Sequence, residues 1–292
     1  MFSMKKQKIL CLTVLMTAWA VAHPQACPGE TVPKDSLGWT KSAAVQLHFS
    51  QTRFDDWAQG GENTWSWLTY LDAGFTRRTE RWRWQSTLRL EYGKSSIESL
   101  GSRKAGDDIY LESILKRTAG MTFQPYAAVS FRTQFDRGYR YPDDSEPVEI
   151  SGFMDPAYAT QSAGISACVH TSLTVRLGAA LKETFTRRHP VPYTDNPASA
   201  GIEKSRVEGG CECTVDWEYQ LNAIVTYITR LESFANLKAF SETDIRWDQK
   251  LTAQLASFVT AGYHMTILYD SNISKKRQIR QILSVGIAYR LM

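Results

Sequence analysis

Residues 82–93 read WRWQSTLRLEYG, and the two sets of alternating positions differ in character. The even positions carry Trp82, Trp84, Leu88 and other uncharged side chains, whereas the odd positions include Arg83, Arg89 and Glu91. An alternation of period two is typical of a β-strand with one apolar and one polar face. Twelve residues are also enough for a strand tilted by about 45° to cross a bilayer.

The same alternation recurs along the chain in about twelve segments of roughly 9–14 residues. Strands of soluble proteins are shorter, with a mode near 5–6 residues, so the length of these segments is itself informative. All ten prolines fall outside the interiors of the segments, as expected because proline cannot donate to a ladder. The predicted strands are 42–51, 64–76, 82–93, 108–118, 125–135, 158–168, 173–186, 212–225, 228–240, 245–256, 258–270 and 279–292.

Short and long connectors alternate between these segments. Long ones are predicted at 52–63, 94–107, 136–157 and 187–211, and short ones between them. This arrangement is typical of outer-membrane barrels, whose periplasmic turns are short and whose outer loops are longer. We therefore predict an all-β fold, an antiparallel transmembrane β-barrel of about twelve strands. The alternative is a secreted β-sandwich, but tryptophans near the predicted strand ends suit an interfacial girdle better.

The N-terminus predicts export. Residues 1–22 combine three lysines, an apolar run at 9–19 and a small-residue cleavage site at 20–22, as in a signal peptide. A retained anchor and a lipoprotein site at Cys27 are the alternatives. Residues 23–40 are then a short periplasmic leader and 41–292 the barrel domain, located in the outer membrane of a Gram-negative cell. No later segment is apolar enough for a transmembrane helix.

Net charge excludes one class of partner. Without the three lysines of the predicted signal peptide, 31 of the 34 basic residues remain against 30 acidic ones. A nearly neutral chain with interspersed charges lacks the basic footprint of a nucleic-acid-binding protein. We expect no nucleic-acid partner.

Charged side chains occupy the face opposite to the lipid-facing one. Neighbouring strands bring opposite signs together there, for example Asp72 beside Arg89 and Glu218 beside Lys238. Two interpretations are open: a charged pore lining that selects solutes, or an ion-paired network that fills the barrel. Inward glycines, which leave space, favour the pore. The predicted lumen-lining residues are Asp72, Arg83, Arg89, Glu91, Glu112, Arg132, Arg176, Asp216, Glu218, Lys238, Arg246 and Asp248.

A few residues suggest other chemistry. His48 and His264 fall on the inner face and flank the last strand, where Ser284 also points inward, so a hydrolase site or a metal pair is an alternative interpretation. No motif supports either, and we expect no catalytic residue, metal or cofactor. Four cysteines remain after the signal peptide. A disulfide between Cys27 and Cys168 and a local interaction between Cys211 and Cys213 are both within reach.

Several motifs resemble a known family. They are Trp-Ala-Gln-Gly-Gly-Glu-Asn at 57–63, Leu-Glu-Tyr-Gly at 90–93, Thr-Gln-Phe-Asp-Arg-Gly-Tyr at 133–139 and Ile-Ser-Gly-Phe-Met-Asp-Pro-Ala-Tyr at 150–158. Over roughly 40–292 the chain is similar to domain-of-unknown-function family 3078, from exported proteins of Bacteroidota type. The resemblance implies an outer-membrane barrel without a known activity. The family-motif residues singled out are Trp57, Gly60, Gly61, Glu62, Asn63, Phe153, Met154, Pro156 and Tyr158.

The functional prediction follows from the barrel. We expect a porin-like, narrow pore or transporter for an unidentified small solute. The first alternative is a filled structural or interaction barrel that displays its outer loops, and the second is an outer-membrane lipid-modifying hydrolase. Expected partners are outer-membrane lipid and the barrel-assembly machinery, because the last strand resembles the signal that this machinery reads.

Overall fold

A computed structural model describes residues 37–291, apart from 56–61, 119–121, 143–144, 171, 196–198, 200 and 240–242. The predicted signal peptide and most of the predicted leader lie outside the described residues. Every regular element in the described part is a β-strand. The strands are β1 (Gly38–Thr52), β2 (Thr64–Arg78), β3 (Trp82–Ile97), β4 (Gly101–Arg117), β5 (Phe123–Thr133), β6 (Gly138–Arg140), β7 (Val148–Ser151), β8 (Ala157–His170), β9 (Leu173–Phe185), β10 (Ser205–Gln220), β11 (Val225–Asn236), β12 (Thr243–Gln254), β13 (Val259–Asp270) and β14 (Ser274–Arg290).

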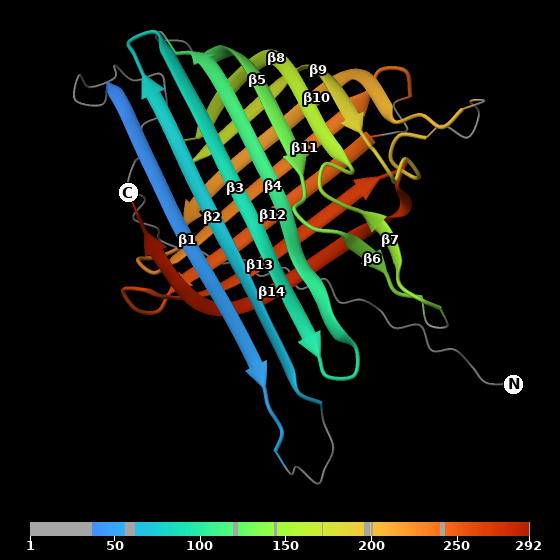
Figure 1. Cartoon of the computed structure of the whole chain (residues 1–292). Helices are drawn as coiled ribbons and strands as arrows, with labels where there is room; N and C mark the ends of the chain where they lie inside the picture. Colours follow the sequence, from blue (N-terminus) through green and yellow to red (C-terminus); the bar gives the residue numbers. More distant parts are fainter. Residues whose placement is uncertain are drawn as a thin grey trace, which may run out of the picture.

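Twelve of these strands form a closed antiparallel barrel (Figure 1). Each pairs with its neighbour in the chain, except that β5 pairs with β8 because β6 and β7 form a separate two-stranded sheet. The barrel closes where β1 pairs with β14, from Ala44 opposite Arg290 to His48 opposite Gly286. These five pairs join the first and last strands of the barrel, and closure of this kind is what allows a sheet to cross a membrane.

The predicted architecture is confirmed, but several connectors differ from the prediction. Residues 94–107 are not a long loop, because β3 and β4 continue as a paired hairpin to a turn at 98–100. Apolar alternation is lost after Gly93 although pairing continues, as expected where both faces of a hairpin lie in water. The predicted loop 136–157 contains β6 and β7, which are too short to show a period in the sequence.

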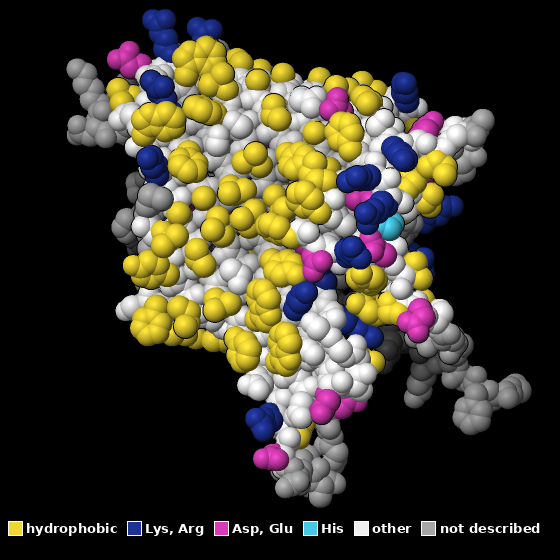
Figure 2. All heavy atoms as spheres, in the orientation of Figure 1, with side chains coloured by type: hydrophobic (Ala, Val, Ile, Leu, Met, Phe, Trp, Pro, Cys, Tyr) yellow, Lys and Arg dark blue, Asp and Glu magenta, His cyan; other side chains and the backbone are white. Residues whose placement is uncertain are grey.

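The outer wall is apolar (Figure 2). Exposed side chains on it include Leu177, at 60% exposure, and Leu283, at 83%. The interior is polar by contrast, since charged residues such as Arg176 and Glu112 are among the most buried. This is the reverse of a soluble protein, in which large apolar residues fill the core. Among the described residues, no helix has the length and apolar character of a membrane span.

Candidate functional site in the barrel lumen

The strand registers place the predicted charged face inside the barrel. Asp72 lies opposite Arg89 on adjacent strands, and their side chains form an ion pair with 3.9 Å between Oδ1 and Nε. Leu88, which precedes Arg89 in β3, points outward beside Leu111. The alternation in the sequence therefore identifies the two faces of the wall correctly.

A cluster of buried charges spans the lumen. One carboxylate oxygen of Glu112, on β4, accepts hydrogen bonds from Arg176 on β9 and from Arg230 on β11, each at 2.7 Å. The side chains of the three residues are only 2–8% exposed. Two arginines on one carboxylate satisfy its charge in a site that water barely reaches.

Further groups extend the cluster. Arg230 donates through Nε to Glu232 at 2.7 Å and through Nη1 to Asp216 at 3.1 Å. The hydroxyl of Tyr110 accepts from Arg230 at 2.9 Å and donates to Glu232 at 3.2 Å. Arg132 lies 3.5 Å from Glu232 and stacks over the Tyr110 ring at 4.5 Å. We call Glu112, Arg176, Arg230, Glu232, Arg132, Tyr110 and Asp216 the central network.

The central network joins walls that are not neighbours. Going round the barrel, β4 and β11 are separated by β5, β8, β9 and β10 on one side and by six strands on the other. A direct contact between Glu112 and Arg230 therefore crosses the lumen instead of running along the wall. Any solute that passes here has to displace or squeeze past these side chains.

Other inward groups fill the lumen beside the central network. Glu91 on β3 holds Arg280 on β14 through two hydrogen bonds, of 2.6 and 3.2 Å. The ammonium of Lys250 lies 4.0 Å from Asp72 and 5.2 Å from the centre of the Tyr70 ring. Towards the end of the barrel near β6 and β7, Lys182 forms an ion pair with Asp244. The lumen thus contains both signs of charge in contact.

The remaining predicted lining residues have mixed outcomes. Arg246 and Asp248 pair on the inner face of β12, with 2.7 Å between Nε and Oδ2. Arg83 is inward, and its Nε is buried without a hydrogen-bond partner.

The predicted pair of Glu218 and Lys238 is wrong. Glu218 lies opposite Ile228, and Lys238 is an exposed residue after the end of β11. The turn at 221–224 comes earlier than predicted, which changes the register of β10 on β11.

Sequence reasoning missed Arg230, Arg280 and Tyr110 as interior groups. The signal was present for Arg230, because it shares the phase of Glu232 on the same strand. Tyr110 likewise shares the phase of Glu112, and Arg280 shares that of Ser284. What the pattern lacks is any sign that these groups meet across the lumen.

The two histidines flank β14 as predicted, but no hydrolase arrangement appears among the described residues. Ser284 Oγ donates to the backbone oxygen of Gly262 at 3.5 Å and makes no hydrogen bond to either histidine. His264 instead lies 3.7 Å from Asp248, and both imidazoles pack edge-on against Tyr70. Within the described ranges, no cluster of His, Cys, Asp and Glu has the arrangement of a metal site.

Cysteine positions divide into two groups. Cys168, at the end of β8, is disulfide-bonded. Cys211 and Cys213 are free thiols and lie within β10, not in an outer loop as predicted. Their register places them on the outward face, two residues apart. Cys27 lies outside the described residues.

Two of the motif residues in the first family segment hold a loop in place. Asn63 accepts a hydrogen bond from the backbone N–H of Phe54 at 2.7 Å and donates to Glu98 at 2.9 Å. Glu62 accepts from Ser99 at 2.6 Å. This motif therefore ties the β1–β2 loop to the tip of the β3–β4 hairpin. Trp57, Gly60 and Gly61 lie outside the described residues.

The family motif at 150–158 lies at the same end of the barrel and includes the loop between β7 and β8. Asp155, between Met154 and Pro156, accepts hydrogen bonds from the backbone N–H groups of residues 187–189, the shortest being 2.7 Å. The carbonyl of Pro156 accepts from Thr133 at 3.0 Å, and Tyr158 follows in β8. Phe153 is 64% exposed. These contacts are structural and fix the loop before β8 against the loop after β9.

A hydrogen bond from Tyr92 links the loop after β5 to β3. The hydroxyl of Tyr92 donates to Asp136 Oδ2 at 2.8 Å, and the backbone N–H of Arg137 donates to Asp136 Oδ1 at 2.8 Å. Hydrogen bonds to the ionised form lower the pKa of the Asp136 carboxyl below its usual value, the bond from Tyr92 contributing most. The loop after β5 is therefore held by a carboxylate.

One family model matches part of the chain. The model of a family described as "Protein of unknown function (DUF3078)" matches residues 49–139, which include the first three motifs. No curated protein matches the chain.

Several solved structures are similar to the chain. One is the translocator domain of the autotransporter NalP from Neisseria meningitidis, with 15% identity, TM-score 0.41 and coverage of 86% of this chain and 87% of that one. Another is an outer-membrane channel from Pseudomonas putida F1, with 13% identity, TM-score 0.40 and coverage of 89% and 99%. A third is the toluene transporter TbuX from Ralstonia pickettii, with 10% identity, TM-score 0.31 and coverage of 87% and 89%. At such identities the likeness concerns the fold alone, and over residues 49–139 the chain is similar to a family of unknown function.

Proposed function

We propose that the protein is an outer-membrane pore with a narrow lumen, which admits a small polar solute and is closed at rest by the central network. The closed barrel, its apolar outer wall and its polar interior support placement in the outer membrane, because only helices and closed barrels satisfy their backbone within lipid. We assign it the role of a passive conduit and not that of an enzyme.

The proposal rests on the fact that, among the described residues, side chains and not a folded plug obstruct the lumen. At the central network, the described part of the lumen is crossed by individual arginine, glutamate, aspartate and tyrosine side chains from β4, β5, β9, β10 and β11. Side chains change rotamer in picoseconds to nanoseconds when freed, whereas a folded plug has to unfold or leave. Twelve strands also give a barrel wider than the eight-stranded kind, which side chains just fill.

The second candidate is a filled barrel that displays its outer loops. Several inward glycines, which the sequence suggests leave space, are in fact approached closely by neighbours. A Cβ added at Gly178 would lie 2.6 Å from the hydroxyl of Tyr126, and one at Gly286 would lie 2.7 Å from Nδ1 of His48. The glycines here make space for other side chains, which favours a packed interior.

Single-channel recording separates the two candidates. We expect refolded wild-type protein to show small, infrequent conductance steps. Arg230→Ala removes the guanidinium that contacts β4 across the lumen, and it should raise conductance several-fold. Arg277→Ala is the matched control, because Arg277 is an exposed residue on the outward face of β14.

Reversal of lumen charge supplies a second test. Replacing Arg89 and Arg132 by glutamate should shift selectivity towards cations if ions pass these groups. A folded wild type and a folded Arg230→Ala variant that both fail to conduct would refute the pore and leave the filled barrel. Folding is checked in each case by the heat-modifiable shift on a gel.

Orientation is tested separately by adding protease to intact cells. We place the end with β6, β7 and the loop at 187–204 outside, because the longer connectors lie there. External protease should cleave at 187–204 and spare the turn at 79–81. The opposite pattern would reverse the orientation.

A further inference from the structure

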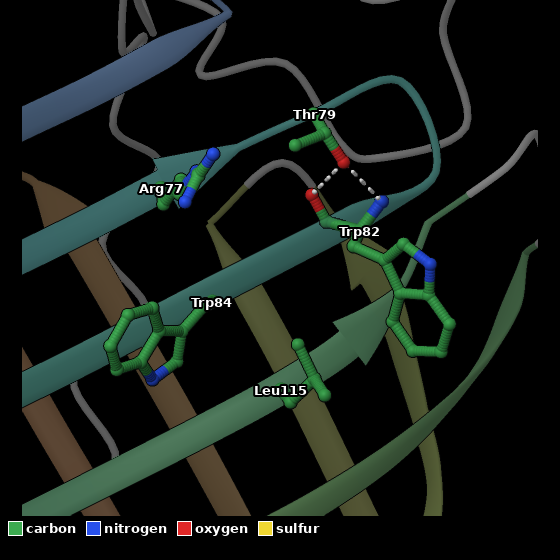
Figure 3. Close-up of a pocket in the computed structure, with 5 residues that line it drawn as sticks. All are labelled: Arg77, Thr79, Trp82, Trp84 and Leu115. Atoms are coloured by element: carbon green, nitrogen blue, oxygen red, sulfur yellow. Dashed lines mark hydrogen bonds between the residues drawn. The ribbon is translucent and has the colours of Figure 1, made fainter.

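The outer wall has a recess at the end of the barrel that carries the β2–β3 turn. Its volume is about 360 Å³, and it is lined by Arg77, Thr79, Trp82, Trp84 and Leu115. Figure 3 shows the two indole rings and Leu115 projecting from β3 and β4 around the opening, with Thr79 at the turn. Hydrogen bonds between Thr79 and Trp82, of 3.0 and 3.2 Å, hold the turn in place.

The recess belongs to a row of side chains that crosses four strands. Trp39, Arg77, Trp84 and Leu115 lie opposite one another in the registers of β1 to β4. All four are on the outward face, because the alternate residues, such as Arg83, face the lumen. An arginine between two tryptophans thus faces the lipid side of the wall, close to the end of the strands.

The geometry of Arg77 leaves its charge available. Its guanidinium carbon lies 5.4 Å from the centre of the Trp39 ring, a cation–π contact that orients the group. Across the described residues, no carboxylate forms a salt bridge with Arg77. Two more exposed cations, Lys41 and Arg117, stand on the same outward face at the same end of β1 and β4. We call the region of Arg77, Lys41 and Arg117 the basic corner. Among the described residues, none of these three cations forms a salt bridge.

A second recess continues the first one along the wall. It has a volume of about 270 Å³ and is lined by Trp39, Phe75, Trp84 and Ser86. Trp84 lines both recesses, and its position is fixed by a hydrogen bond of 2.8 Å from its Nε1 to Ser113. Trp39 packs edge-on against it, with ring centres 5.8 Å apart. An apolar groove thus leads from the basic corner towards the middle of the wall.

We propose that this corner is a binding site for one glycerophospholipid of the periplasmic leaflet. The phosphate lies at Arg77, with Lys41 and Arg117 adding to the local potential, and an acyl chain lies in the groove formed by Trp84 and Phe75. Arginine matches the geometry of a phosphate oxygen pair, and tryptophan suits the boundary between headgroup and hydrocarbon. The leaflet follows from the orientation proposed above, whereas the site itself does not depend on whether the lumen conducts.

Native mass spectrometry of the refolded barrel in detergent tests this site. The probes are dioleoyl phosphatidylglycerol, dioleoyl phosphatidylethanolamine and dioleoylglycerol, which lacks the phosphate. We expect retention of one molecule of either phospholipid and no comparable retention of dioleoylglycerol. Arg77→Gln should weaken retention about tenfold, the effect of one hydrogen bond to a charged group.

Two controls make the result decisive. Arg277→Gln removes an outward arginine near the opposite end of the barrel and should leave retention unchanged. Millimolar inorganic phosphate should not displace the lipid, because the groove contributes to its binding. Unchanged retention in folded Arg77→Gln, equal loss in Arg277→Gln, equal binding of dioleoylglycerol or displacement by phosphate alone would each overturn the proposal. Conductance is measured separately, so a failure of the pore does not affect this result.

Discussion

Removal of the Glu112 carboxylate is the sharpest test of how the lumen is held together. Glu112→Gln keeps the size of the side chain but removes the charge that two buried arginines share. Arg230 retains Glu232 and Asp216 as partners. Arg176 has Glu112 as its only salt-bridge partner in the described part of the chain, and its Nε and Nη1 are already buried without a hydrogen-bond partner.

The expected magnitude follows from burial. Breaking a buried ion pair by removing one partner costs about 3–5 kcal/mol, and we expect the lower end because glutamine still offers one acceptor. Asp72→Asn is the matched control. Its ion pair with Arg89 is 3.9 Å long, and both side chains are more than 40% exposed, so the loss should be about 1 kcal/mol or less.

Urea unfolding in lipid vesicles, followed by tryptophan fluorescence and by the heat-modifiable gel shift, measures both losses. Combining Glu112→Gln with Arg176→Met should recover part of the stability, because the orphaned charge is gone. Equal losses for Glu112→Gln and Asp72→Asn would refute the reasoning, and so would a double variant no more stable than the single one.

Three further predictions concern the wall, the outer loops and the cysteines. Leu88→Arg, on the lipid-facing side, should cost about 2–4 kcal/mol in urea unfolding, whereas Thr87→Arg, beside Glu112 in the lumen, should cost far less; equal costs would mean that the faces are misassigned. The pKa of Asp136 is lowered in the folded state, so its contribution to the stability of the loop after β5 is complete above its usual pKa of 3.8 and is lost as pH falls through the lower folded value. Limited proteolysis of this loop should therefore accelerate below about pH 4. Asp136→Asn should abolish that pH dependence and leave the loop loose at neutral pH. Mass spectrometry of non-reduced peptides should find Cys168 linked to Cys27, and a linkage to Cys211 or Cys213 would contradict both the prediction and the free thiols of β10.

Some features of the protein are determined by local sequence. The alternation in β3 assigns Leu88 to the lipid side and Arg89 to the lumen, because successive side chains of a strand point to opposite faces. Short turns fix adjacent registers in the same way, so the pair of Asp72 and Arg89 was predictable from β2 and β3. The apolar outer face, the barrel class and its strand number follow from repeating this pattern.

Contacts across the lumen were decided by the tertiary structure alone. Glu91 pairs with Arg280, which is 189 residues away, and not with the nearer cations of the neighbouring strands. Alternation says that both side chains point inward, but it contains no information on which walls face each other after closure. That depends on the stagger accumulated around the whole barrel, to which every turn contributes. A turn at 221–224 instead of 226–227 is enough to separate Glu218 from Lys238. The sequence thus determines which side chains enter the lumen, and the closed barrel determines which of them meet.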